Sequence, residues 1–157
     1  MKYILTFDDY VKMNESLEHL TIKPSPKKGF NDSFNQRINI QLNGKSIGYT
    51  LLVSHKPEMI SFEYTEIKPE YRNMGYGTKA KILIKEYIKG EYPQVKTIFA
   101  SPYSKQSFYS LIKAFGQPAS EEHETFDEIK GFVDEYLPDT FDGKIDGADY
   151  IDLSFNI

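Results

Sequence analysis

The spacing of hydrophobic and polar positions changes several times along this chain, and each change marks a predicted element. Two runs typical of strands, 37–42 and 46–54, are separated by Asn43-Gly44-Lys45, a strong signal for an antiparallel hairpin. The next run, 59–68, alternates with period two and predicts another strand. This alternation places Ile60, Phe62 and Tyr64 on one face and Ser61, Glu63 and Thr65 on the other.

Helical spacing begins after a turn at 72–77 and predicts a helix closed by Gly90. Its apolar stripe comprises Ala80, Leu83, Ile84, Tyr87 and Ile88. A buried strand is predicted at 95–100. The stripe Phe108, Leu111, Ile112 and Phe115 then predicts a second helix, which ends at Gly116-Gln117-Pro118.

The two ends of the chain extend this alternation of strands and helices. Thr125 and Glu128 match a capping box that opens a helix stopped by Pro138, and 150–157 predicts a final strand. Near the N-terminus, 1–7 predicts a short strand, and Thr6 and Asp9 resemble a capping box. The stripe of the helix that it would open consists of Tyr10, Met13, Leu17 and Leu20.

The stretch 23–32 collects proline and glycine and predicts a loop. Together the elements predict an α/β (α+β) fold, in which helices pack on a twisted mixed sheet. A length of 157 residues suits a single domain over 1–157, with a divergent acidic C-terminal part from about 117.

Composition narrows the class of protein. Apolar residues make up 39% of the chain, with 12 Tyr and 11 Phe, which excludes a wholly disordered protein. Cysteine is absent, so disulfides, thiolate zinc sites and a cysteine nucleophile are excluded. The N-terminus reaches Asp8 and Asp9 without an apolar run typical of a signal peptide or membrane span, and a soluble, cytoplasmic protein is expected.

The net charge of −4 is unevenly distributed. Residues 121–157 hold 12 of the 23 acidic residues and only two lysines, while residues 1–120 carry an excess of basic residues. This asymmetry favours an anionic ligand on the basic part and a cationic one near the acidic part. A solvated acidic surface is the simpler explanation of the acidic residues in 121–157.

The turn between the predicted strand 59–68 and the helix closed by Gly90 carries the strongest chemical signal. It reads Arg72-Asn73-Met74-Gly75-Tyr76-Gly77-Thr78. Glycines allow a positive φ and close approach of a ligand, and the first N–H groups of a helix lack intrahelical acceptors, so the turn can hold a pyrophosphate. An ordinary strand-to-helix turn is the alternative. A dinucleotide fingerprint and a Walker A loop both fit worse, because the required order of glycines, or of glycine and lysine, is missing.

The run 67–78, from Ile67 through Pro69, Tyr71 and Arg72 to Thr78, resembles the acetyl-CoA-binding motif V-x-P-x-Y-R-x-x-G-x-G-x of the GNAT N-acetyltransferases. The resemblance covers about half of the chain, from the hairpin to the helix at Phe108. It implies a splayed central sheet with acetyl-CoA as acyl donor in the V-shaped opening. The main chain of 72–78 would wrap the pyrophosphate, and the strand near Ile67 would pair with the pantetheine arm.

The resemblance also implies candidate catalytic residues. Glu63 lies four residues before Ile67, where related enzymes often carry an acid, and it is the candidate general base, with Glu66 as a weaker substitute. Tyr109 resembles the tyrosine that protonates the leaving thiolate, with Tyr103 in reserve. The family's asparagine near this helix and its closing Tyr-x-x-x-Gly-Phe are absent, so the register of Tyr109 stays open, as does a purely structural role for either side chain.

Other candidate sites receive no role. The three histidines are scattered, without ligand spacing. An acidic stretch at 142–152 superficially suggests a calcium loop, but Lys144 and Leu153 occupy positions that need oxygen ligands. Lys79, Lys81, Lys85 and Lys89 are expected on the solvated side of their helix, and the acidic balance argues against nucleic-acid binding.

The sequence therefore favours an N-acetyltransferase that moves an acetyl group from acetyl-CoA to a primary amine by direct transfer. The acidic C-terminal part suggests a cationic acceptor such as a polyamine, an aminoglycoside or a lysine side chain. A non-catalytic CoA-binding or protein-interaction module on the same fold is the alternative. No metal, nucleic-acid or membrane partner is expected, and the chain is expected to be a monomer or a homodimer.

Overall fold

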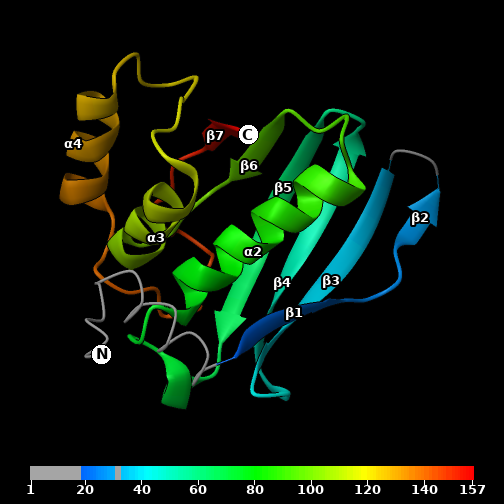
Figure 1. Cartoon of the computed structure of the whole chain (residues 1–157). Helices are drawn as coiled ribbons and strands as arrows, with labels where there is room; N and C mark the ends of the chain where they lie inside the picture. Colours follow the sequence, from blue (N-terminus) through cyan, green and yellow to red (C-terminus); the bar gives the residue numbers. More distant parts are fainter. Residues whose placement is uncertain (1–18, 31–32) are drawn as a thin grey trace, which may run out of the picture.

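The computed structural model describes residues 19–30 and 33–157 (Figure 1). Its strands are β1 (Leu20–Pro24), β2 (Lys28–Phe30), β3 (Ser33–Leu42), β4 (Lys45–Lys56), β5 (Met59–Ile67), β6 (Thr97–Ala100) and β7 (Leu153–Asn156). Its helices are the 3₁₀ turn η1 (Pro69–Tyr71), α2 (Tyr76–Glu91), α3 (Lys105–Phe115) and α4 (Phe126–Tyr136). The strands form one sheet in the order β1-β3-β4-β5-β6-β7, and β2 also pairs with β3.

The predicted hairpin joins β3 to β4. Asn43 and Gly44 turn the chain with φ angles of 51° and 81°. Two consecutive positive φ angles are the mark of the primed turns that match the twist of antiparallel strands, so the Asn-Gly signal is confirmed. β5 continues the antiparallel pairing on β4.

The sheet becomes mixed at β6, which pairs parallel with β5. α2 provides the crossover and lies across one face of the sheet, with α3 beside it and α4 further out (Figure 1). Apolar side chains from this sheet face and from the three helices form the main core. Its fully buried members include Ile38, Leu52, Ile60, Ile84, Ile98, Phe108 and Phe155.

A second, smaller core cluster fixes the start of α2. It consists of Ile40, Ile47, Tyr76 and Ala80, with Leu20, Leu42, Ile67 and Tyr71 packed against it. The ring of Tyr76, the first residue of α2, is 5% exposed. The turn that precedes α2 is therefore held from below by the sheet.

Some predicted elements differ from the structure. The loop expected at 23–32 is wrong in part, because β1 ends at Pro24 and Lys28–Phe30 forms β2. Proline is tolerated there because β1 lies at the edge of the sheet. Leu20, expected at the end of a helix, begins β1, and the strand and helix predicted before residue 19 lie outside the described residues. Gly90 does not close α2, which continues to Glu91.

Across residues 19–30 and 33–157, no helix is long and apolar enough to cross a membrane.

Candidate functional site

The pairing between β5 and β6 stops midway along β5. The two strands pair from Met59 with Thr97 to Phe62 with Ala100, where β6 ends. The remaining part of β5, from Glu63 to Ile67, pairs with β4 on its other side only. Main-chain groups along this side of β5 therefore have no strand partner within the described residues. This is the splayed sheet that the resemblance implied.

A β-bulge lies at the same point. Leu51 pairs with Tyr64 and Leu52 with Phe62, which leaves Glu63 as the extra residue on β5. Glu63 is exposed at this position. The bulge and the end of the parallel pairing coincide at one residue, so the carboxylate predicted as the base stands where β5 separates from β6.

The bulge corrects the predicted alternation along β5. An extra residue moves every later side chain to the opposite face. Tyr64, expected beside Phe62 on the core face, is 47% exposed, and its ring lies 5.8 Å from that of Tyr49 on the outer face. Thr65, expected on the polar face, points into the molecule, with its hydroxyl 3.0 Å from that of buried Thr50. Glu66 follows Tyr64 onto the outer face, because it pairs with Tyr49.

The turn between β5 and α2 contains two residues with positive φ angles. Asn73 and Gly75 have φ angles of 63° and 81°, and a Cβ added to Gly75 would meet no atom within 4 Å. The Arg72 side chain donates from Nε to the carbonyl oxygen of Ile67 over 2.7 Å. The guanidinium thus ties the turn to the end of β5, a role other than charge attraction of a ligand.

The first turn of α2 contains no acidic residue, and no side chain of the described residues caps it. The first helical hydrogen bond runs from the Lys79 N–H to the Gly75 oxygen, at 3.1 Å. Helix starts attract anions through their N–H groups and dipole. A ligand with a pyrophosphate fits the chemistry of this turn, because N–H donors, a first turn without acidic residues and, among the described residues, open space over Gly75 coincide.

One residue beside this turn was missed in the sequence. Lys81, expected on the solvated side of α2, is 6% exposed, so that prediction is wrong. Its Nζ donates to Ser110 Oγ on α3 over 3.0 Å, and the Ser110 and Thr78 hydroxyls are also 3.0 Å apart. Burial lowers the pKa of Lys81 to about 8. The pattern held this information, because position 81 lies one turn after Gly77 and one turn before Ile84, at the edge of the helix face that packs on the core.

The start of α3 touches the same turn. Gln106 Nε2 donates to Asn73 Oδ1 over 2.7 Å, and the Gln106 N–H donates to the Asp139 carbonyl oxygen over 3.1 Å. Lys105 forms an ion pair with Asp139, at 3.6 Å. Asp139, in the acidic segment after α4, therefore lies against Lys105 and Gln106 at the start of α3. Gln106 in turn contacts Asn73 in the turn before α2.

A shallow depression of about 400 Å³ lies in this acidic segment. Aromatic and acidic side chains line it, among them Tyr103, Phe141, Asp142, Asp146 and Asp149, together with Lys144. The Tyr103 ring lies 5.0 Å from that of Phe141 and 5.5 Å from that of Tyr150. Tyr103, the reserve proton donor, is therefore part of this aromatic group.

Tyr109 points toward α4. Its hydroxyl donates to Asp134 Oδ1 over 3.1 Å, and the residue is 37% exposed. The pKa of Tyr109 is raised, first by partial loss of solvent and then by the hydrogen bond to Asp134 and its charge. The proton-donor role of Tyr109 stays a prediction.

No protein-family model matches this sequence, and no curated protein sequence matches it. Solved structures do. The chain is similar to an acetyltransferase from Bacillus subtilis crystallised with CoA, with 14% identity over 88% of this chain and 99% of that one, and a TM-score of 0.56. It is similar to a GNAT family acetyltransferase from Elizabethkingia anophelis with acetyl-CoA bound, with 16% identity over 88% and 98% of the two chains and a TM-score of 0.53.

Spermidine N-acetyltransferase from Vibrio cholerae, crystallised with CoA and spermine, is similar over 99% of this chain and 78% of its own, with 12% identity and a TM-score of 0.56. The described strands and helices thus have the fold of the GNAT acetyltransferases, a splayed mixed sheet flanked by helices, which confirms the predicted fold.

Proposed function

We propose that this chain, as one domain over 1–157, is an N-acetyltransferase that transfers an acetyl group from acetyl-CoA directly to a primary amine. The observation that carries the proposal is the start of α2 after the positive-φ turn at Gly75, which has no acid in its first turn and no capping side chain from residues 19–30 or 33–157. It lies beside the point where the pairing of β5 with β6 ends. Bound acetyl-CoA would supply the activated acyl group as a thioester.

In this proposal the main chain of the turn holds the cofactor. The residues that wrap the pyrophosphate are Arg72, Asn73, Met74, Gly75, Tyr76, Gly77 and Thr78, and main-chain groups near Ile67 pair with the pantetheine arm. The fixed geometry of the turn supports this role, because Arg72 and Gln106 hold it from two sides before any ligand arrives. Donors fixed in advance lose little conformational entropy when the ligand binds.

Glu63 is the proposed general base. An amine must lose a proton around its attack on the thioester carbonyl, and the base takes it directly or through a water molecule. The exposed position of Glu63 at the bulge supports this role. Tyr109 is kept as the proposed donor of the proton that the departing thiolate takes up, and its hydroxyl would have to leave Asp134 to do so.

The proposed acceptor is a cationic amine. The depression lined by Tyr103, Phe141, Asp142 and Asp149 supports this, because carboxylates and aromatic faces both attract ammonium groups. Two similar structures carry such acceptors: spermine in the spermidine N-acetyltransferase, and kanamycin in an aminoglycoside acetyltransferase with 14% identity over 80% and 67% of the two chains and a TM-score of 0.52.

The experiment that tests the function measures free thiol released from acetyl-CoA in the presence of single amines. The panel contains a polyamine, an aminoglycoside, a lysine peptide and a neutral primary alkyl amine without a second charge. Release that depends on the amine, fastest with the polycations, is the expected result. CoA binding without release across the panel would favour the module without catalysis, an alternative that the Tyr109–Asp134 contact supports. Absence of CoA binding would overturn the proposal.

Replacement of Glu63 by Gln tests the catalytic base. Turnover should fall by roughly 100-fold or more well below the pKa of the amine, and should recover as pH rises and the amine loses its proton unaided. The matched control is Glu66→Gln on the outer face of β5, which should leave the pH profile of kcat/KM unchanged. If Glu63→Gln keeps the wild-type pH profile, Glu63 has no part in proton transfer.

A further inference from the structure

A lysine ammonium group is buried at the contact between α2 and α3. Lys81 is 6% exposed, and its Nζ lies 3.0 Å from Ser110 Oγ. The same Nζ is 3.9 Å from the point where a Cβ on Gly77 would stand. Helical side chains lean toward the N-terminus of their helix, which brings this amine from the second turn of α2 back to the first.

The described part of the chain provides no negative charge beside Lys81. α3 contains Lys105 and Lys113 but no acidic residue, and the acids of α2, Glu86 and Glu91, lie in its second half. Among the residues that the structure describes, no carboxylate lies within ion-pair distance of Lys81, and Lys105 with Asp139 forms the one ion pair. A buried charge without a counter-ion is destabilising, and an apolar side chain would suit this position better.

We propose that Lys81 is a side-chain ligand of the anion at the start of α2: its ammonium group, held by Ser110, contacts phosphate oxygens over Gly77 from the α3 side. The inference rests on the proposed function, since it assigns one more residue to the cofactor site. It explains why a buried cation is kept where the fold alone would favour an apolar residue. Gly77 places no side chain between the Lys81 Nζ and the main chain of the turn.

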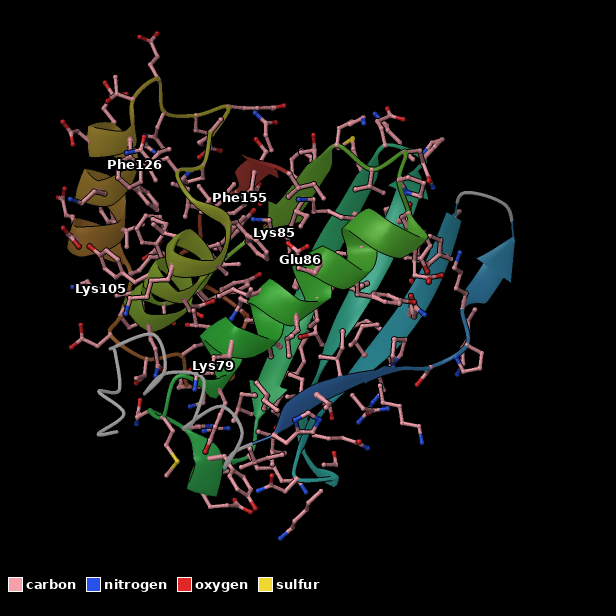
Figure 2. The ribbon with its side chains drawn as sticks, viewed as in Figure 1. Lys79, Lys85, Glu86, Lys105, Phe126 and Phe155 are labelled. Carbon is pink, nitrogen blue, oxygen red and sulfur yellow. The ribbon has the colours of Figure 1, made fainter. Side chains whose placement is uncertain are left out.

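Lys79 provides the matched comparison. It stands two residues before Lys81 and is exposed, near the start of α2 (Figure 2). Lys79 can attract an anion only through solvent, where screening weakens the interaction. If charge alone mattered, the two lysines would contribute alike. A direct contact requires Lys81 to contribute far more.

The experiment measures binding of CoA and of pantetheine, which lacks every phosphate, by calorimetry with the full chain. Lys81→Met should weaken CoA binding by roughly 10- to 100-fold, the range for a hydrogen bond to a charged group. Its affinity for pantetheine should be unchanged. Lys79→Met should change CoA binding by about threefold or less. A merely structural Lys81 would alter both ligands equally.

The outcomes separate this inference from the proposed function. If the wild-type protein binds CoA and Lys81→Met binds it as tightly, or weakens CoA and pantetheine alike, the inference is overturned while the function stands. If the wild-type protein binds no CoA, both fall. Should Lys81→Met fail to fold, NMR of the wild-type protein with ¹³C-labelled lysine decides. The Lys81 Cε signal should shift on addition of CoA and not of pantetheine, and an unshifted signal with CoA overturns the inference.

Discussion

α2 and α4 begin in opposite ways. At α4, the Thr125 hydroxyl accepts from the Glu128 N–H over 3.2 Å, and the Glu128 carboxylate accepts from the N–H groups of Glu124 and Thr125. Asp127 and Glu128 add negative charge to the first turn. At α2, no side chain of the described part of the chain caps the start, no acid lies in the first turn, and a buried lysine stands beside it.

The two helix starts differ in how their first turns are capped. At α4, the side chains of Thr125 and Glu128 accept hydrogen bonds from N–H groups at the helix start, so this capping box has a structural role. α3 is similar, because Ser104 caps it and the carbonyl groups of Pro138 and Asp139 accept from its first N–H groups. Of these three helices, α2 alone combines a buried lysine with a start that no described side chain caps, and this contrast supports the proposal that a ligand binds there.

The largest predicted effect comes from a carboxylate placed in the open turn. Gly75→Glu should weaken CoA binding by about 1,000-fold or more, roughly 4 kcal/mol, because the new charge repels phosphate at the helix start and a side chain is strained at a φ of 81°. Gly44→Glu is the control, since Gly44 has the same φ of 81° and equally open surroundings in the β3–β4 turn. Calorimetry should find CoA affinity unchanged in the control. Equal losses in both variants would mean that strain, and not the site, is responsible.

The second effect is on stability without ligand, and it has a defined pH window. Burial lowers the pKa of Lys81 from 10.5 to about 8, so below pH 8 the folded protein carries a buried charge that is unfavourable by about 3 kcal/mol. Lys81→Met should therefore raise the free energy of unfolding at pH 7 by up to this amount.

Between pH 8 and 10.5 the unfolded chain keeps a proton that the folded protein has released, so wild-type stability rises with pH relative to Lys81→Met. Urea unfolding at pH 7, 8.5 and 10 measures the difference between the two proteins. The advantage of Lys81→Met should shrink at each step. A difference that does not depend on pH would show that the Lys81 amine does not titrate in this window.

The third effect comes from placing at the start of α2 a carboxylate like that of Glu128 in α4. Thr78 occupies the third position of α2, as Glu128 does in α4. Thr78→Glu should weaken CoA binding by roughly 10- to 100-fold, because the carboxylate can pair with Lys81 and occupy the N–H groups of the first turn. Thr78→Gln, with the same shape and no charge, should lose much less. Thermal melting should show both variants folded, and equal affinities for CoA would remove charge as the cause.

Local rules predicted the half of the site that is built from adjacent residues. The αL conformation at Gly75, the Asn-Gly turn of the hairpin and the Thr125–Glu128 capping box each depend on a few neighbours in sequence. The bulge at Glu63 depends on how β5 aligns with β4, and the burial of Lys81 depends on contact with Ser110. These two features arise from residues 10 to 29 positions apart, so the local pattern placed Tyr64 and Lys81 on the wrong faces.

The smallest predicted effect removes the cap of α4. Thr125→Ala should lower the free energy of unfolding by about 1 kcal/mol, since the Glu128 N–H loses its acceptor and the helix start loses half of its reciprocal pair. CoA affinity should stay within about twofold of wild type, because no described contact joins Thr125 to the turn at Gly75. Thr125→Ser, which keeps the hydroxyl, is the control and should restore most of the stability. If Thr125→Ala weakened CoA binding as strongly as Thr78→Glu, the two helix starts would be coupled, and the division between a structural start and a ligand-binding start would be wrong.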